Sequence, residues 1–205
     1  MMLNKVILEG KTKEDIINKY LEENNLTEAD IFYTEREVKG GLLKGKKLEL
    51  EIFSKKDIMK FIKDFVAGLK ENMGIEITAE VRENEGIYNV LLVTDNNPVI
   101  IGKDGRTIDA IQLLLRQSLL NQTGKNIKVI VDASDYRSSK QRSFEREIKK
   151  IAREVLKTKV EAKLDPMNSF NRRIVHALLA DYENLETESF GETPNRYVVI
   201  RYKEN

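Results

Sequence analysis

The sequence predicts an α+β protein made of three small modules in tandem. Short runs of alternating apolar residues are interspersed with segments of helical periodicity along all 205 residues. Capping signatures mark several helix starts, and neither a low-complexity tract nor an internal repeat interrupts the pattern. With 40% hydrophobic and 34% charged residues, the chain is expected to be globular and to bury more than one small core.

The first module, residues 1–53, is expected to follow the order β-α-β-β. A strand is predicted over residues 5–9, and a capping box that begins at Thr12 starts a helix that ends near Asn24. Two further strands, over residues 31–38 and 48–53, flank the stretch KGGLLKGKK. Its lysines are a candidate phosphate patch, although a solvated turn between strands is the favoured interpretation; they are Lys39, Lys44, Lys46 and Lys47.

The pattern of the second module, residues 54–134, predicts the order α-β-β, then a pair of glycines, then α-β. Ser54 repeats the capping signature, and the apolar residues after it recur at helical spacing up to a stop at Gly74. A further helix is predicted to begin near Arg106. Alternating apolar residues predict the strands, which cover residues 75–81, 87–94 and 127–131.

The third module, residues 135–205, opens with a long helix predicted from Tyr136 to about Lys159. Between Tyr136 and Lys163 there are ten basic and four acidic residues. A second helix is opened by DPMNSFNRR. The strands of this module are predicted over residues 160–163, 185–189 and 197–201. No flexible spacer separates this module from the second one.

Composition excludes several classes of protein. The absence of cysteine excludes a disulfide scaffold and a thiolate metal site, and fits a reducing, cytoplasmic setting. No apolar stretch approaches the roughly 18 residues of a membrane span, and no signal peptide is evident. The net charge is only +1, so contact with a polyanion must come from local geometry.

The stretch PVIIGKDGRTIDAI places Gly102 and Gly105 between a short apolar turn, residues 98–101, and a helix. Glycine allows a close approach of the backbone to a bulky group, and helix N-terminal amides favour phosphate. Lys103 adds a mobile ammonium group at the same edge. A plain structural turn is the alternative, because a bare G-x-x-G motif is weak. In this setting, however, the stretch resembles a type II KH domain, whose elements follow the order α-β-β-α-α-β and whose G-x-x-G loop clamps about four nucleotides of a single strand.

The stretch NRRIVHALL places Arg172 and His176 four residues apart, on one helical face that is expected to be largely exposed. Arginine and imidazole both bind phosphate oxygens, and Arg196 returns on a later strand. The alternative is a histidine at the edge of the core. Tyr88 and Tyr197 are candidate base-stacking residues, although packing within a strand with the hydroxyl outward is the favoured interpretation.

Taken together, MNSFNRRIVHALL and ESFGETPNRYVVI resemble the Arg-x-x-x-His domain that binds single-stranded nucleic acid. Preceded by the KH pattern and VDASDYRSSKQRSFERE, they make nearly the whole chain similar to the bacterial Jag family, also called SpoIIIJ-associated RNA-binding proteins. The resemblance implies an N-terminal Jag domain and a cytoplasmic RNA-binding regulator of cell elongation and division, hence of cell shape. It also implies pairing with a smaller KH-domain protein, or with a second copy.

The implied RNA-binding residues fall into two sets, neither of which is catalytic. The clamp falls on Gly102, Lys103, Asp104 and Gly105, with Arg106 beside it, and the second site falls on Arg172, His176 and Arg196.

No catalytic motif accompanies these sets. A P-loop would need a hydroxyl after Lys103, where Asp104 stands, and the single histidine cannot build a metal site. We therefore expect a non-catalytic protein without cofactor or metal that binds single-stranded RNA, or single-stranded DNA. The alternative is a protein-interaction adaptor at the membrane-insertion or cell-envelope machinery.

Overall fold

The computed structural model describes residues 2–38 and 47–204, apart from the side chains of residues 37, 38 and 47. It confirms the mixed α+β class, with three separate three-stranded sheets. The lysine-rich stretch considered as a phosphate patch, including the Lys47 side chain, lies outside the described residues. No helix in the described ranges is both long enough and apolar enough to cross a membrane.

The first sheet is antiparallel, and one helix packs on it. Its strands lie in the order β1 (Val6–Gly10), β3 (Lys47–Ser54) and β2 (Ile31–Val38). The helix α1 (Lys13–Asn24) begins at Thr12, whose side chain accepts a hydrogen bond from the Asp15 amide at 3.2 Å. It buries Ile16 and Tyr20 against Leu50 of β3. A short 3₁₀ helix, Glu28–Asp30, precedes β2.

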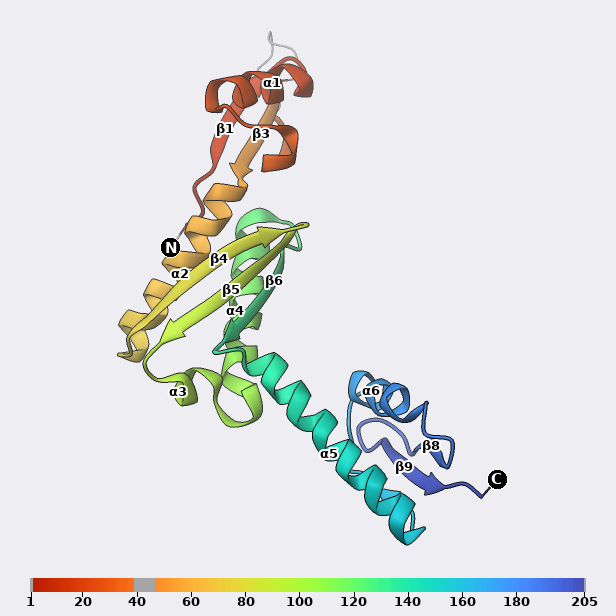
Figure 1. Ribbon diagram of the computed structural model, residues 1–205. Coiled ribbons are helices and arrows are strands. Elements are labelled where there is room, and N and C mark those ends of the chain that lie inside the picture. The colour runs from red at the N-terminus through yellow and green to blue at the C-terminus, as the bar shows by residue number, and fades with distance from the viewer. Residues whose placement is uncertain (1, 39–46, 205) are drawn as a thin grey trace. The chain divides into compact units, whose positions relative to one another are not determined.

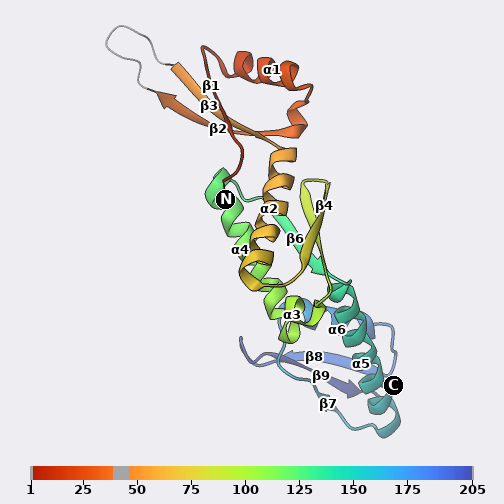
Figure 2. The ribbon, with the colours of Figure 1, turned by 90° about the vertical axis from the view of Figure 1, so that its left-hand side faces the viewer.

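The second sheet carries two long helices on one face, as Figures 1 and 2 show. Its strands are β4 (Ile77–Asn84), β5 (Ile87–Thr94) and β6 (Lys128–Ala133); β4 and β5 are antiparallel, and β5 and β6 are parallel. The helices are α2 (Lys55–Met73) and α4 (Arg106–Thr123). Where the sequence suggested only a turn, residues 97–101 form the five-residue helix α3 (Asn97–Ile101), with Pro98 in its first turn.

The N-terminal segment packs into the core of the second sheet. Leu3 is 6% exposed and lies in the same hydrophobic cluster as Phe53 and Ile58. Its amide donates to Gln122 Oε1 at 3.1 Å, which ties the third residue of the chain to the last turn of α4.

Asn4 adds a link to the start of α2, because its amide group donates to Asp57 Oδ1 at 3.0 Å. Burial disfavours the charged form of Asp57, but hydrogen bonds from Ser54 and Asn4 outweigh it and hold the pKa of this carboxyl below its ordinary value. Residues 1–136 accordingly form one compact unit. The boundary near residue 53 stays a prediction.

Residues 137–205 form the second unit. Its antiparallel sheet has the order β7 (Ala162–Lys163), β9 (Tyr197–Tyr202) and β8 (Leu185–Phe190). The helix α6 (Ser169–Leu179) and nearly all of α5 (Tyr136–Thr158) belong to this unit (Figure 1). The core of the unit is built from Ile148, Ala152, Val155, Val175, Leu179, Val198 and Ile200.

Replacing Leu3 with alanine should lower the free energy of unfolding by about 2 kcal/mol, because it removes a buried side chain from the second core. Urea denaturation followed by circular dichroism measures the change. Met2→Ala is the matched control, since Met2 is 86% exposed and its loss should leave stability unchanged. Equal stability of the two variants would show that the segment does not belong to the core.

Candidate nucleic-acid interface

The loop between α3 and α4 is a sharp reversal built from left-handed residues. Gly102 has φ 69°, Asp104 has φ 56° and Gly105 has φ 84°. Lys103, Asp104 and Gly105 form a single 3₁₀ turn, in which the Gly105 amide donates to the Gly102 carbonyl at 3.3 Å. Such a succession of turns brings several backbone amides to one side of the chain, which favours an anion.

Both glycines of this loop have a positive φ, and at both positions a neighbouring residue lies too close for a Cβ. A Cβ on Gly102 would lie 3.0 Å from the Thr107 amide nitrogen. A Cβ on Gly105 would lie 2.6 Å from Cε1 of the Tyr136 ring. The loop is therefore pressed onto the first turn of α4 on one side and onto the first residue of α5 on the other.

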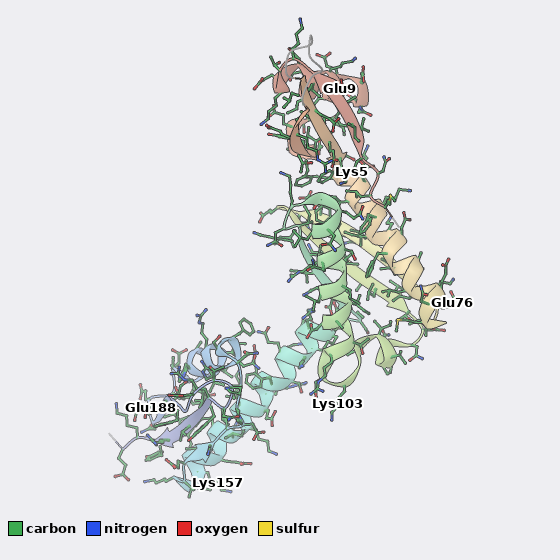
Figure 3. The ribbon with its side chains drawn as sticks, turned by 180° about the vertical axis from the view of Figure 1, so that it is seen from behind. Lys5, Glu9, Glu76, Lys103, Lys157 and Glu188 are labelled. Atoms are coloured by element: carbon green, nitrogen blue, oxygen red, sulfur yellow. The ribbon has the colours of Figure 1, made fainter. Side chains whose placement is uncertain are left out.

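The start of α4 differs from the starts of α1 and α2. Thr12 and Ser54 cap those two helices with their side chains, whereas Gly105 has no side chain with which to cap α4. The start of this 18-residue helix, which carries partial positive charge, therefore has no side-chain cap, although Asp109 lies in its first turn. Lys103, Asp104 and Arg106 are exposed, and Lys103 lies on the loop beside this helix start (Figure 3).

In the second unit, Arg172 is held toward the N-terminal end of α6. Its Nη1 donates to the Met167 carbonyl at 2.8 Å, and the Met167 amide donates to the Arg196 carbonyl at 3.0 Å. Met167 therefore connects Arg172 with the segment that leads into β9. Arg196 itself is exposed. The structure thus brings Arg172 and Arg196 to neighbouring elements, as a joint site requires.

His176 lies between two hydroxyl groups of β8. Nδ1 is 2.7 Å from Thr187 Oγ1, and Nε2 is 2.9 Å from Ser189 Oγ. A neutral imidazole donates at one nitrogen and accepts at the other, so one hydroxyl accepts and the other donates. The hydroxyl that accepts from the ring keeps its own O–H to offer to another acceptor.

The two hydroxyl residues were missed in the sequence. Thr187 and Ser189 stand two apart in LETESF, so they share one face of their strand. This spacing is a signal that sequence reasoning can use, but their pairing with a histidine eleven and thirteen residues earlier is decided only by the packing of α6 on β8.

The structure decides how exposed the candidate side chains are. Arg172 and His176 are half-buried, whereas their spacing on the helix predicted that both would be largely exposed. Tyr88 packs in the core and is not available for stacking on a base, because it is 1% exposed. Burial also raises its pKa. Tyr197 is half-buried and stacks on Phe190 with ring centres 6.1 Å apart.

Two parts of the chain match known domain families. Residues 59–131 match the KH domain of the KhpA/KhpB proteins, and residues 142–202 match the domain family that is named for its Arg-x-x-x-His motif. The first range contains the Gly102–Gly105 loop, and the second contains Arg172, His176 and Arg196.

Several bacterial proteins are similar along the chain. The RNA-binding protein KhpB of Clostridium symbiosum is 31% identical, over 98% of this chain and 93% of that protein. The protein of the same name from Bacillus subtilis is 28% identical, over 98% of this chain and all of that protein. KhpB of Lactiplantibacillus plantarum is 31% identical over 67% of this chain and 42% of its own length.

Gly105→Ala should lower the free energy of unfolding by about 2–4 kcal/mol, because it combines an unfavourable φ with overlap on the Tyr136 ring. Gly124→Ala is the matched control: its φ is 65°, and nothing lies within 4 Å of a Cβ there. The control should lose about 1 kcal/mol from φ alone. Chemical denaturation compares the two, and equal losses would mean that the Tyr136 contact imposes no constraint.

Proposed function

The chain belongs to the KhpB family, also called Jag, and on that premise we propose that it binds single-stranded RNA and acts without catalysis. The observation that carries the proposal is the Gly102–Gly105 loop, in which three residues of positive φ lie against a helix start that no side chain caps. The relatives that match over nearly the whole chain bear the name RNA-binding protein.

The clamp works through the backbone. An RNA strand carries one phosphate per nucleotide, and the loop can bring phosphate oxygens close to backbone amides because neither glycine carries a Cβ. Lys103 then supplies a mobile positive charge and Arg106 a second one at the start of α4. Contacts of this kind hold the strand without reading its bases.

The second site combines a guanidinium with hydroxyl groups. One N–H group of Arg172 is anchored on Met167, which preorganises the planar fork for a phosphate oxygen. His176 acts by orienting Thr187 and Ser189 rather than by direct contact alone. Arg196, exposed just before β9, adds a further cation.

The family resemblance extends this proposal to post-transcriptional control linked to cell elongation and division, in the cytoplasm. A protein partner is the second candidate, because three leucines of α4 are exposed: Leu113 by 67%, Leu114 by 56% and Leu120 by 41%. Exposed leucine side chains suit contact with a protein surface better than contact with a phosphate backbone. These leucines support a role as an adaptor, or pairing with another KH-domain protein, in addition to RNA binding.

Lys103→Asp should weaken RNA binding at least about tenfold, because it places a second carboxylate beside Asp104 and removes the lysine contact. Folding should barely change at an exposed position. Lys63→Asp is the matched control, since Lys63 is also exposed and is also followed by an aspartate; its affinity should change less than about twofold. Fluorescence anisotropy with a labelled oligonucleotide provides the measurement, and unchanged binding by folded Lys103→Asp protein would remove the clamp.

Arg172→Ala combined with His176→Ala should abolish the gain in affinity that oligonucleotides longer than about four bases show when they engage both sites. The variant should also be destabilised by about 2–3 kcal/mol, because it leaves the partners of both side chains unsatisfied. Leu179→Ala provides a control of similar instability, since it removes a core residue of the same helix and should keep the gain.

The readout of this experiment is the dissociation constant as a function of oligonucleotide length, measured well below the unfolding temperature. A flat dependence on length in the wild-type protein would contradict two cooperating sites and favour the adaptor role. The same loss of gain in Leu179→Ala protein would assign the effect to instability.

A further inference from the structure

The helix α5 carries a continuous basic stripe that belongs to neither RNA-binding set. Apart from the adjacent pair Lys149 and Lys150, its six members recur at intervals of three or four residues, which places them on one side of a helix. They are Arg142, Arg146, Lys149, Lys150, Arg153 and Lys157. From the first member to the last, the stripe spans about 22 Å of helix. Lys157, at the far end, is labelled in Figure 3.

The stripe faces away from the core of its own unit. The apolar side of α5 packs into that core through Ile148, Ala152 and Val155. Five members of the stripe are exposed, and Lys149 is half-buried. The orientation of the helix is therefore set by its apolar side, and the basic residues are left toward solvent.

No member of the stripe forms an ion pair with any residue in the described part of the chain. Other cations of the same unit do: Lys159 pairs with Glu204, and Arg201 pairs with Glu161 and Glu188. The acidic residues of α5 lie off the stripe, at Glu145, Glu147 and Glu154. Like charges at this spacing repel one another, so an external anion is a partner that their arrangement suits.

We propose that this stripe binds the phosphate backbone of single-stranded RNA. The proposal rests on the proposed RNA binding and extends it. The stripe contains no aromatic side chain, so it has nothing on which a base can stack, and its contacts are electrostatic and independent of sequence. Three of its members are arginines, whose planar forks bind phosphate oxygens in pairs.

A membrane surface is disfavoured as the partner. A basic amphipathic helix binds a bilayer by inserting its apolar face below the headgroups. In α5 that face is already buried against α6 and the sheet, through Ile148, Ala152 and Val155. Only the charges remain available, and they match a polyanion that stays in water.

The test is a triple variant with a matched control. Arg146→Gln, Lys150→Gln and Arg153→Gln together remove three exposed charges of the stripe, at spacing i, i+4 and i+7. Lys56→Gln, Lys60→Gln and Lys63→Gln remove three exposed charges at the same spacing from α2. Both proteins should melt within about 2 °C of wild type, because all six positions are exposed.

The measurement is the affinity for a labelled oligouridine of roughly 20 nucleotides at several salt concentrations. The slope of log affinity against log salt should become shallower by about 2 in the stripe variant, since each neutralised phosphate contributes about 0.7. Affinity at low salt should fall at least about tenfold, whereas the α2 control should keep both its slope and its affinity within about twofold.

Equal slopes for the stripe variant and the α2 control would overturn the proposal. Lys103→Asp protein is measured beside them so that the two proposals can be distinguished. If Lys103→Asp lowers RNA affinity and the stripe variant does not, the proposed function stands and the stripe is not an RNA-binding surface. Stripe-dependent binding to phosphatidylserine vesicles, with RNA affinity unchanged, would assign the stripe to a membrane surface and would also overturn the proposal. Stripe-dependent binding to an acidic protein segment, with RNA affinity unchanged, would assign the stripe to a protein partner and would also overturn the proposal.

Discussion

The close approach of the Tyr136 ring to Gly105 is the constraint on which the first candidate site depends. With the ring 2.6 Å from where a Cβ would lie, only glycine fits at Gly105, and its φ of 84° is available to glycine at little cost. A second close approach, of Gly102 to Thr107, packs the loop against the first turn of α4, whose start has no side-chain cap. These two contacts place a backbone surface with partial positive charge at the helix start, which does not require a basic protein.

The second site is arranged differently, because its polar groups also hold the fold together. His176 is bonded through both ring nitrogens, and Arg172 is bonded to a carbonyl of the preceding segment. Such groups arrive at a ligand already oriented, which reduces the entropy lost on binding. They also make the site sensitive to the stability of its unit, so a loss of binding there has two physical causes that need separate controls.

The small net charge of the chain hides a local concentration of positive charge on α5. The chain has a net charge of only +1, yet α5 presents six basic residues along one face, none of them in an ion pair within the described ranges. Elsewhere in the same unit, basic side chains are engaged in ion pairs, as with Arg201 between Glu161 and Glu188. A basic stripe and a backbone clamp are complementary ways to hold a polyanion, because the first acts at long range and the second at contact distance.

The sequence alone determined the elements whose signals are local. Period-2 and period-3.6 patterns located all of the longer strands and helices, and the caps at Thr12 and Ser54 marked two helix starts, because both signals arise within a few residues of the element. The five-residue helix α3 was seen only as a turn, since five residues are too few to establish a period. The glycines at Gly102 and Gly105 were also found from sequence, although the ring that requires Gly105 was not.

Only the tertiary structure decided which distant residues meet. Leu3 joins the second core and bonds Gln122, 119 residues away, and His176 meets Thr187 and Ser189 across the packing of a helix on a strand. The exposure of the two Arg-x-x-x-His side chains depended on that same packing, so periodicity overestimated it. The physical reason is that periodicity reports which face of an element is apolar, whereas the identity of the residue that covers that face depends on the packing of the whole chain.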